Sequence, residues 1–394
     1  MAPCFLAKAR MGAEGCSMKN ILIIPHTTEL SVRQRLREIG GALSRYYRVY
    51  FLLWSEPATG HFLDKTTASL KDIFRRPGTY EKDGLFFARI PLWHRPLCMI
   101  KSYNVRSLEK FLIAHDIDIV INGTHYFFVT PLAKKHRYKH IFDLNDLPAE
   151  DARSPLGRFI HEFAKREIEK ADIVTACSRG LVDYVQGHFG RTASFLPNGT
   201  YLGEFKNVDT GAVKKIRQKY NLADKFIIGY IGHIGEWIDL EFLVNVFRAV
   251  KARSPDIALM IAGGGQKIEH YRRLLKEKDI VFTGGIPRSE ITPYFFAIDA
   301  GVMPGKKNLF QDVAFHIKLI EYTAARKMVI SSPLKEVERL GFPNVFIENM
   351  NVEAWARLIN KIRFMPWDPG WDNLVTDYDW EKIGEGFREI IEKF

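Results

Sequence analysis

The second half of the chain alternates apolar runs with stretches whose apolar residues recur at helical spacing. Apolar runs at residues 226–234 and 258–266 both end in glycines, and an amphipathic stretch follows each of them. A helix over residues 317–325 and a short strand over residues 328–330 come later. Strands that alternate with helices at this rhythm predict an α/β fold with a parallel, doubly wound sheet.

The first half repeats this alternation with less regular spacing. A helix is predicted over residues 31–46, and a long helix over residues 156–170. Pro197 and Asn198 mark the crossing into a second domain. Apolar runs predict strands at residues 20–25, 48–54, 85–90, 117–123, 140–146, 172–178 and 193–197.

Length and composition indicate a globular chain of two domains. The 394 residues suffice for two separate cores, and 46% hydrophobic and 26% charged residues are ordinary globular values. No apolar stretch has the length of a membrane span, and the N-terminus lacks the apolar core of a signal peptide. Residues 1–17 are expected to be an extension. The spacing of the cysteines favours reduced, cytosolic thiols at Cys4, Cys16, Cys98 and Cys177.

The segment from residue 304 to residue 332 carries the most informative arrangement of charges. In its predicted helix, Lys318, Glu321 and Tyr322 are spaced so that a cation and a carboxylate share one face. The carboxylate can accept hydrogen bonds from two vicinal hydroxyls, and the lysine and the helix N-terminus favour an anion such as a diphosphate. An ordinary amphipathic helix with a surface Lys–Glu pair gives the same pattern, so the segment needs support from its context.

The run KLIEYTAARKMVI at residues 318–330 resembles the donor motif of the GT-B glycosyltransferases of retaining family 4, the group 1 glycosyltransferases. In that family the motif Lys-Leu-x-Glu-Tyr-x-Ala-x-Gly-x-Pro-Val-Val holds a nucleotide sugar. The chain departs from it at Arg326, in place of the glycine, and at Met328, in place of the proline. The earlier acid of the family's Glu-x7-Glu pair falls on Val313, so its role is unfilled or passes to a neighbour such as Asp312.

This resemblance implies an architecture as well as a site. It predicts two Rossmann-like, doubly wound domains that face a cleft. Residues 18–196 would bind the acceptor, residues 197–377 would bind the nucleotide sugar, and a helix in residues 378–394 would return to the first domain. Enzymes of this fold generally need no metal and no cofactor. The Asp-x-Asp at Asp116 and Asp118 precedes its strand, which is the wrong end for a ligand site.

The family likeness also assigns the donor-binding residues. His233 stands where many relatives have an arginine, and the lysine that usually follows is absent. Lys318, backbone amides near Gly232 and Gly235, or Arg179 would therefore have to serve the phosphates. The complete predicted donor set is Gly232, His233, Gly235, Gly263, Gly264, Lys318, Leu319, Glu321 and Tyr322.

Three residues are candidates for catalysis: His125, Glu236 and Asp239. His125 follows a predicted strand but lies two residues later than the family's histidine, so a loop histidine without a catalytic role is the alternative. For Glu236 and Asp239 the alternative is capping of the following helix. In the first domain, Asp143 and Asp146 could orient an acceptor hydroxyl or form an Asx turn.

The net positive charge is concentrated in the first half. Residues 1–200 hold 29 Lys and Arg against 20 Asp and Glu, whereas the remainder holds 28 against 26. This imbalance suggests an anionic partner, either a lipid diphosphate, a membrane surface or nucleic acid. Residues 91–110 mix aromatic and basic side chains in a way that suits a membrane interface, although a core helix or loop with solvated charges is an equal alternative. The acceptor or membrane candidates are Trp93, Arg95, Lys101 and Arg106.

The sequence therefore predicts a hexosyl-type glycosyltransferase that uses a nucleoside-diphosphate sugar. Its acceptor would be a lipid-linked or polysaccharide chain, and retention of anomeric configuration follows from the family likeness. The enzyme would be cytoplasmic and peripheral on the cytoplasmic face of the membrane. Nucleic acid is disfavoured because no recognised binding motif accompanies the charge. The alternative is a noncatalytic relative that binds nucleotide sugars, suggested by Val313 and the missing Arg/Lys pair.

Overall fold

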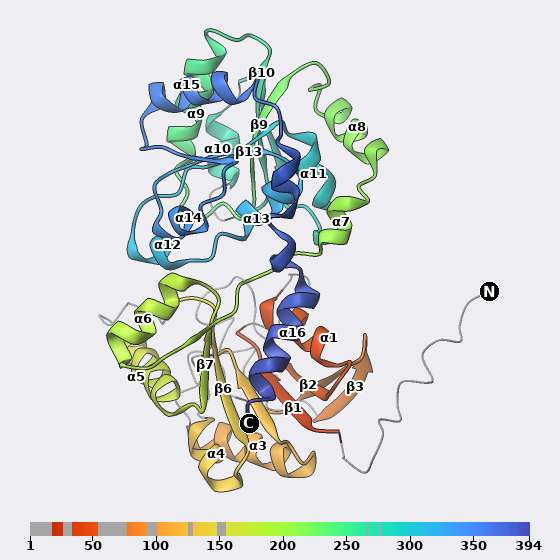
Figure 1. Cartoon of the computed structure of the whole chain (residues 1–394), viewed down its shortest axis with the longest axis vertical. Coiled ribbons are helices and arrows are strands. Elements are labelled where there is room, and N and C mark those ends of the chain that lie inside the picture. The colour runs from red at the N-terminus through yellow and green to blue at the C-terminus, as the bar shows by residue number, and fades with distance from the viewer. Residues whose placement is uncertain are drawn as a thin grey trace, which may run out of the picture.

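The computed structural model describes residues 18–26, 34–53, 77–92, 101–124, 129–147, 155–265, 268–275 and 277–394. The chain forms two lobes, one above the other in Figure 1, and each lobe is a mainly parallel sheet with helices packed on both faces. This confirms the predicted fold class, an α/β chain of two Rossmann-like domains.

The N-terminal domain is built on an eight-stranded sheet with the order β3-β4-β2-β1-β5-β6-β7-β8. Neighbouring strands are parallel except for β3 and β4, which form an antiparallel hairpin. The strands are β1 Asn20–Ile24, β2 Arg48–Leu53, β3 Gly78–Lys82, β4 Leu85–Arg89, β5 Ile119–Asn122, β6 Lys139–Leu144, β7 Ile173–Ala176 and β8 Ser194–Phe195. The helices are α1 Arg35–Leu43, α3 Lys101–Ala114, α4 Thr130–His136, α5 Pro155–Lys170 and α6 Arg179–Phe189.

The central strand β1 is apolar throughout because both faces of the sheet are covered. Ile21 and Ile23 pack beneath α1 and the C-terminal helix α16 (Trp380–Ile391), whereas Leu22 and Ile24 pack beneath α3 and α4. None of these four side chains is exposed to solvent. A parallel strand buried on both faces loses the polar alternation of a surface strand, which explains the continuous apolar run in the sequence.

The C-terminal domain contains six parallel strands in the order β11-β10-β9-β12-β13-β14. This is the Rossmann order, and it reverses direction between β9 and β12, where ligands of such sheets bind. The strands are β9 Phe226–Ile231, β10 Ile257–Ala262, β11 Ile280–Gly284, β12 Ala300–Met303, β13 Met328–Ser331 and β14 Val345–Ile347. The helices are α7 Leu202–Lys206, α8 Thr210–Lys219, α9 Leu240–Lys251, α10 Ile268–Leu274, α11 Thr292–Ala297, α12 Leu309–Val313, α13 Ile317–Ala324, α14 Lys335–Leu340 and α15 Val352–Ile362, with short 3-10 turns η2 Arg288–Glu290, η3 Pro369–Asn373 and η4 Thr376–Tyr378.

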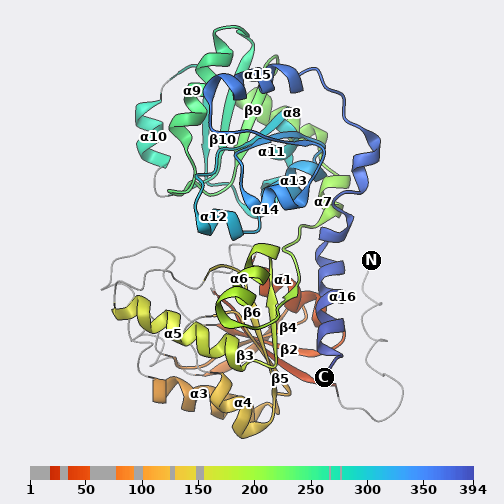
Figure 2. The same cartoon turned by 60° about the vertical axis from the view of Figure 1, so that its left-hand side comes forward.

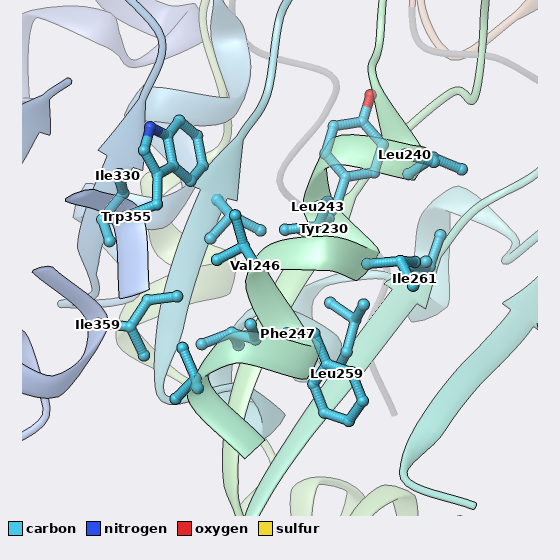
Figure 3. Packing of buried hydrophobic residues seen from close by; sticks show 14 of the residues in the cluster. Tyr230, Leu240, Leu243, Val246, Phe247, Leu259, Ile261, Ile330, Trp355 and Ile359 are labelled. Carbon is cyan, nitrogen blue, oxygen red and sulfur yellow. The ribbon is translucent and has the colours of Figure 1, made fainter. Parts of the chain in front are cut away.

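Helices α9 and α15 close one face of this sheet. Figure 3 shows Val246 and Phe247 of α9 gathered with Trp355 and Ile359 of α15 and with Leu259 of β10. Helices α8, α11 and α13 pack on the opposite face, in a second cluster that contains Leu319 and Tyr322. Fully burying one such side chain contributes about 1.5–3 kcal/mol, so the two clusters hold the strand ends in fixed positions.

A buried ion pair fixes the linker between the domains. Arg35, at the start of α1, lies 2.9 Å from the carboxylate of Asp143 on β6, and both side chains are at most 4% exposed. The same guanidinium donates to the carbonyl of Pro197 and to the side chain of Asn198. The hydroxyl of Thr175 donates to Asp143. The linker is therefore tied to strand β6 of the N-terminal sheet.

The last helix, α16, crosses from the C-terminal domain and lies along the N-terminal domain beside α1, as the blue helix in Figures 1 and 2 shows. Trp380, Ile383 and Phe387 are buried in the same cluster as β1 and β2. Gly384 packs so closely on α1 that an added Cβ would lie 2.2 Å from the Cβ of Ala42. The N-terminal core thus includes the C-terminal end of the chain.

Candidate active site

A cavity of about 690 Å³ lies between the two domains. Its N-terminal wall is formed by the ends of strands and by α1, and its C-terminal wall by the segment after β11 and by α13. The linker and the first residue of α16 close one end. The lining residues are Pro25, His26, Gln34, Arg35, Leu36, Gly123, Asp143, Asn145, Asn198, Gly199, Ile286, Arg288, Ile291, Ile317, Glu321 and Trp380.

Glu321 is the predicted donor residue that faces this cavity. It projects from α13, and its side chain is 14% exposed. Arg288 approaches it from η2, with 3.4 Å between Nη2 and Oε1, and the same Nη2 lies 3.8 Å from a carboxylate oxygen of Glu204 on α7. A carboxylate on the wall of an interdomain cavity can accept hydrogen bonds from the hydroxyls of a sugar or ribose.

Lys318, one turn before Glu321, lies across the end of β9. A Cβ added to Gly232 would sit 2.0 Å from the Cε of Lys318, and Gly232 has a φ of +148°, so glycine is required there on two counts. The ammonium lies 5.7 Å from the ring centroid of Tyr230. Burial lowers the pKa of Lys318, and the nearby Glu321 carboxylate opposes that shift. A cation held this way at a strand end suits a phosphate.

The other predicted glycines pack two loops against each other. Gly232 donates its N–H to the carbonyl of Ala262, and Gly263 donates to that of Gly284. A Cβ on Gly263 would lie 2.0 Å from the carbonyl oxygen of Gly232. In turn, the carbonyl of Gly264 accepts a hydrogen bond from Ile234. The amides of Gly232 and Gly263 are thus already bonded, and these glycines shape the site by close packing.

Aromatic side chains cover the remaining part of the predicted phosphate loop. The Trp237 ring lies against Gly235, and a Cβ added to Gly235 would be 2.4 Å from that ring. The Trp237 ring also stacks on the ring of His233, with 5.5 Å between the ring centroids. Burial lowers the pKa of His233, and the charge of Lys318 lowers it further. His233 is therefore held near Lys318 in a setting that favours its neutral form.

Leu319 and Tyr322 have fully buried side chains and do not line the cavity. The Tyr322 hydroxyl accepts a hydrogen bond from the N–H of Ile231 and donates to the carbonyl of Gly229, both on β9. Their side chains therefore support the strand behind the site, and the polar side chains that α13 presents at the site are Lys318 and Glu321.

The catalytic candidates occupy different settings. The carboxylate of Asp239 accepts a hydrogen bond from the N–H of Phe242, so it caps α9. Glu236 is exposed and directly follows Gly235. His125, Trp93 and Arg95 lie outside the described residues, as does the side chain of Lys101. Arg106 is exposed on α3.

The structure also locates the residues that sequence reasoning weighed as substitutes. Arg179 points to the ring of Phe195 and donates its backbone N–H to Glu336, so it lies outside the cavity lining. Asp312 accepts a hydrogen bond from the N–H of Lys335 at the start of α14. Val313 is buried against Gly180 of α6, where an added Cβ would lie 2.8 Å from its Cα. The position of the family's first acid is therefore part of an interdomain contact.

Sequence reasoning missed two arginines of the site. Arg35 lies at the start of a predicted helix, but its pairing with Asp143 spans 108 positions and follows from the fold alone. Asp143 thus serves the linker through Arg35, which neither of its predicted roles included. Arg288 lies in a short turn after an edge strand, and no periodic pattern in the sequence marks it as a site residue.

Two family models match the chain, one in each domain. The model described as glycosyl transferases group 1 matches residues 225–363, and the model described as glycosyltransferase family 4 matches residues 60–203. The chain belongs to the group 1 glycosyltransferases. The family predicted from the KLIEY motif is thereby confirmed.

Two curated relatives are named as glycosyltransferases. A GDP-mannose-dependent alpha-(1-6)-phosphatidylinositol monomannoside mannosyltransferase from Mycolicibacterium smegmatis is 28% identical over 228 residues, which are 54% of this chain and 57% of that protein. TuaH from Bacillus subtilis, named for teichuronic acid biosynthesis, is 23% identical over 64% of this chain and 65% of its own. The chain thus matches between about half and two thirds of the length of these relatives.

Solved structures share the fold of this group 1 glycosyltransferase at low identity. HepE from Anabaena, solved in complex with UDP and glucose, has a TM-score of 0.70 at 16% identity over 96% of this chain and 100% of that one. Among the helices that the structure describes, none is both long and apolar enough to cross a membrane.

Proposed function

We propose that this chain transfers a hexose from a nucleoside-diphosphate sugar to a lipid-linked or polysaccharide acceptor, with retention of anomeric configuration. The observation that carries the proposal is the pairing of Glu321, on the wall of the interdomain cavity, with Lys318, packed over Gly232 at the end of β9. One group suits vicinal hydroxyls and the other suits a diphosphate, and they are one helical turn apart.

In this proposal the chain's own groups stabilise the departing diphosphate. Glu321 holds the two ribose hydroxyls, and the ammonium of Lys318 and the N-terminus of α13 face the phosphates. The glycosidic bond to the leaving phosphate breaks as charge develops there, so fixed dipoles and cations lower the barrier. His125, Glu236 and Asp239 remain the candidates for contacts to the sugar, and Asp239 would have to give up its cap on α9.

The acceptor is proposed from charge and from the names of the relatives. One relative is named for a phosphatidylinositol monomannoside and another for teichuronic acid biosynthesis, so the names point to a glycolipid or a glycan as acceptor. The N-terminal half carries most of the net positive charge, and Arg106 is exposed on α3. We therefore propose peripheral binding to the cytoplasmic face of an anionic membrane. Sedimentation with anionic vesicles should weaken as salt rises, and salt-independent sedimentation would count against it.

The central test replaces Glu321. Full-length wild-type protein and Glu321→Ala would be incubated with a membrane lipid extract and labelled GDP-mannose or UDP-glucose, and label would be counted in the lipid and polymer fractions. Losing hydrogen bonds to a charged group costs about 1.5–3 kcal/mol, so transfer should fall roughly tenfold to over a hundredfold at subsaturating donor. Glu353→Ala, on the exposed face of α15, is the matched control. Wild-type transfer rates in Glu321→Ala would overturn the assignment.

A binding protein without turnover is the second candidate, and the burial of Val313 is the observation that favours it. The position of the family's first acid contributes no carboxylate to the cavity, and neighbouring Asp312 is engaged at the start of α14. Donor binding by calorimetry without label transfer to any lipid or glycan fraction would select this alternative. Transfer by the wild type would eliminate it, and NMR of the product's anomeric proton would test retention.

A further inference from the structure

Arg288 occupies a fixed corner of the interdomain cavity. It follows the loop after β11 and begins η2, and its side chain is 22% exposed. Its Nη2 lies between two carboxylates, 3.4 Å from Glu321 and 3.8 Å from Glu204. The hydroxyl of Thr292 donates to the same oxygen of Glu204 at 3.1 Å. Two elements, α7 and α13, therefore position the guanidinium.

In the proposed orientation of the donor, the nucleotide base lies at this corner of the cavity. A nucleotide carries its base and its diphosphate on opposite sides of the ribose. With the ribose on Glu321 and the diphosphate toward Lys318, the base extends away from Lys318, toward the segment after β11. The cavity wall there combines the apolar side chains of Ile286 and Ile291 with the guanidinium of Arg288. Isoleucines suit the faces of a flat ring, and the arginine suits its polar edge.

We propose that Arg288 reads the base of the donor and selects keto bases, guanine or uracil, over the amino bases adenine and cytosine. This inference rests on the proposed function. A guanidinium presents only N–H donors, in a rigid fork. Guanine offers the acceptors O6 and N7, and uracil offers the acceptor O4, whereas adenine and cytosine place an amino group at the equivalent position. An amino group facing a guanidinium brings donor against donor, so both groups lose a partner.

The test compares matched nucleotides on the full chain. Calorimetry would give dissociation constants for GDP and ADP, which differ at position 6 of the purine, and for UDP and CDP, which differ at position 4 of the pyrimidine. A good arginine–base pair discriminates by about tenfold or more, so GDP should bind at least about tenfold tighter than ADP, or UDP than CDP. The tighter of the two keto nucleotides identifies the ring size that the site accepts.

Two substitutions connect this preference to Arg288. In Arg288→Gln the amide both donates and accepts, so the keto preference should disappear. Arg288→Lys keeps a donor-only cation, so the keto nucleotide should still bind more tightly than its amino counterpart, with a smaller ratio. Arg248→Gln is the matched control, since that arginine pairs with Glu277 on the side of α9, on the opposite face of the sheet from α13.

Each outcome bears on one of the two claims. Equal binding of all four nucleotides to the wild type would overturn the base selection and leave the proposed function standing. An equal loss of affinity for all four nucleotides in Arg288→Gln would mean that the arginine contacts the ribose or the phosphates. That result would also overturn the base selection. If no nucleotide binds the wild type, the proposed function fails and this inference with it. Melting curves show whether each variant is folded, and if Arg288→Gln is not, the order of affinities in Arg288→Lys decides.

Discussion

At the scale of single residues, two groups with strongly shifted pKa values lie side by side in the N-terminal core. Glu167 on α5 is fully buried and accepts hydrogen bonds from the N–H groups of Val129 and Thr130 at the start of α4. Its other oxygen lies 3.3 Å from Nε2 of His140, which is 1% exposed. Burial raises the pKa of Glu167 to about 8 and lowers the pKa of His140 to about 3. The pair is therefore neutral in the folded protein over most of the physiological range.

The two shifted groups act on stability in opposite directions. The pKa of Glu167 rises from 4.5 to about 8, so the folded state keeps a proton that the unfolded state loses, and the free energy of unfolding falls as pH rises through that window. The pKa of His140 falls from 6.5 to about 3, so its contribution is lost as pH drops from 6.5 to about 3. Between pH 4.5 and 6.5 the two slopes oppose each other.

Glu167→Gln should remove the part of the fall in the free energy of unfolding that accompanies a rise in pH. The amide oxygen can still accept from Val129 and Thr130, and the amide N–H₂ can donate toward His140, but the side chain no longer titrates. At about 1.4 kcal/mol per pH unit, the variant should lose about 2 kcal/mol less than the wild type between pH 6.5 and 8 in urea titrations. Glu162→Gln, exposed on the same helix, should follow the wild type. If the free energy of unfolding changed with pH in the same way for Glu167→Gln and the wild type, the pKa of Glu167 would not be raised in the folded protein.

At the scale of elements, the Tyr322 hydroxyl supplies hydrogen bonds to β9 where β12 no longer pairs with it. Strands β9 and β12 are paired only at Ile228 and Gly229 before they separate toward the ligand edge. Beyond that point the Tyr322 hydroxyl accepts from the N–H of Ile231 and donates to the carbonyl of Gly229. Helix α13 therefore serves the site twice, with Glu321 at the cavity and Lys318 over Gly232 on one side, and with Tyr322 against strand β9 on the other.

Tyr322→Phe should destabilise the C-terminal domain without changing its packing. The ring stays in place, but a buried N–H loses its partner, which costs about 1–3 kcal/mol. Urea unfolding followed by circular dichroism would measure the loss. Tyr80→Phe, whose side chain is 47% exposed on β3, should be close to neutral. An unchanged urea midpoint in Tyr322→Phe would mean that water or a rearranged strand accepts the hydrogen bond of the Ile231 N–H.

The elements also show what the sequence can predict. The helix at residues 317–325 and the strand at residues 328–330 were predicted to within one residue of α13 and β13, because each combines a clear period with flanking loops. The strand predicted over residues 226–234 ends at Ile231, since Gly232 turns the chain with a positive φ. Strand β3 was missed because all five of its residues are exposed and it pairs only at the sheet edge.

The candidate site was predictable only where it depends on local spacing. Lys318 and Glu321 follow from the period of one helix, and the sequence placed both at the cleft. Arg288 and Arg35 act through partners far along the chain, on α13 and β6, and no local pattern encodes such pairs. The glycines were predicted to bind the donor from their places at strand ends, but their close packing against one another depends on how two loops meet in space.

At the scale of the whole molecule, the domains are joined on two sides. On one side the linker is tied to Arg35, and α16 packs on α1. On the other side α6 of the N-terminal domain meets α12 and α14 of the C-terminal domain. There the hydroxyl of Ser178 donates to the carbonyl of Val313, and Arg339 pairs with Asp183. The cavity lies between the two domains, so its width depends on how both attachments hold them.

Glu336 is the residue through which the second attachment can be tested. It lies on α14, is 2% exposed, and accepts the N–H groups of Arg179 and Gly180 at 2.9 and 3.0 Å. These two donors form the N-terminus of α6, where the helix dipole favours a carboxylate. In Glu336→Gln the amide offers one acceptor oxygen and turns its N–H₂ toward a second N–H donor.

The substitution should loosen the contact between the domains. A hydrogen bond to a charged group contributes about 1.5–3 kcal/mol, so Glu336→Gln should melt at a lower temperature and give a larger radius of gyration in X-ray scattering. Glu338→Gln, exposed on the same helix, is the control for charge and helix propensity. Saturating nucleotide should bring the radius of the variant back toward that of the wild type if donor binding closes the cavity. Scattering curves that coincide for Glu336→Gln, Glu338→Gln and the wild type would show that the linker and α16 alone set the spacing of the domains.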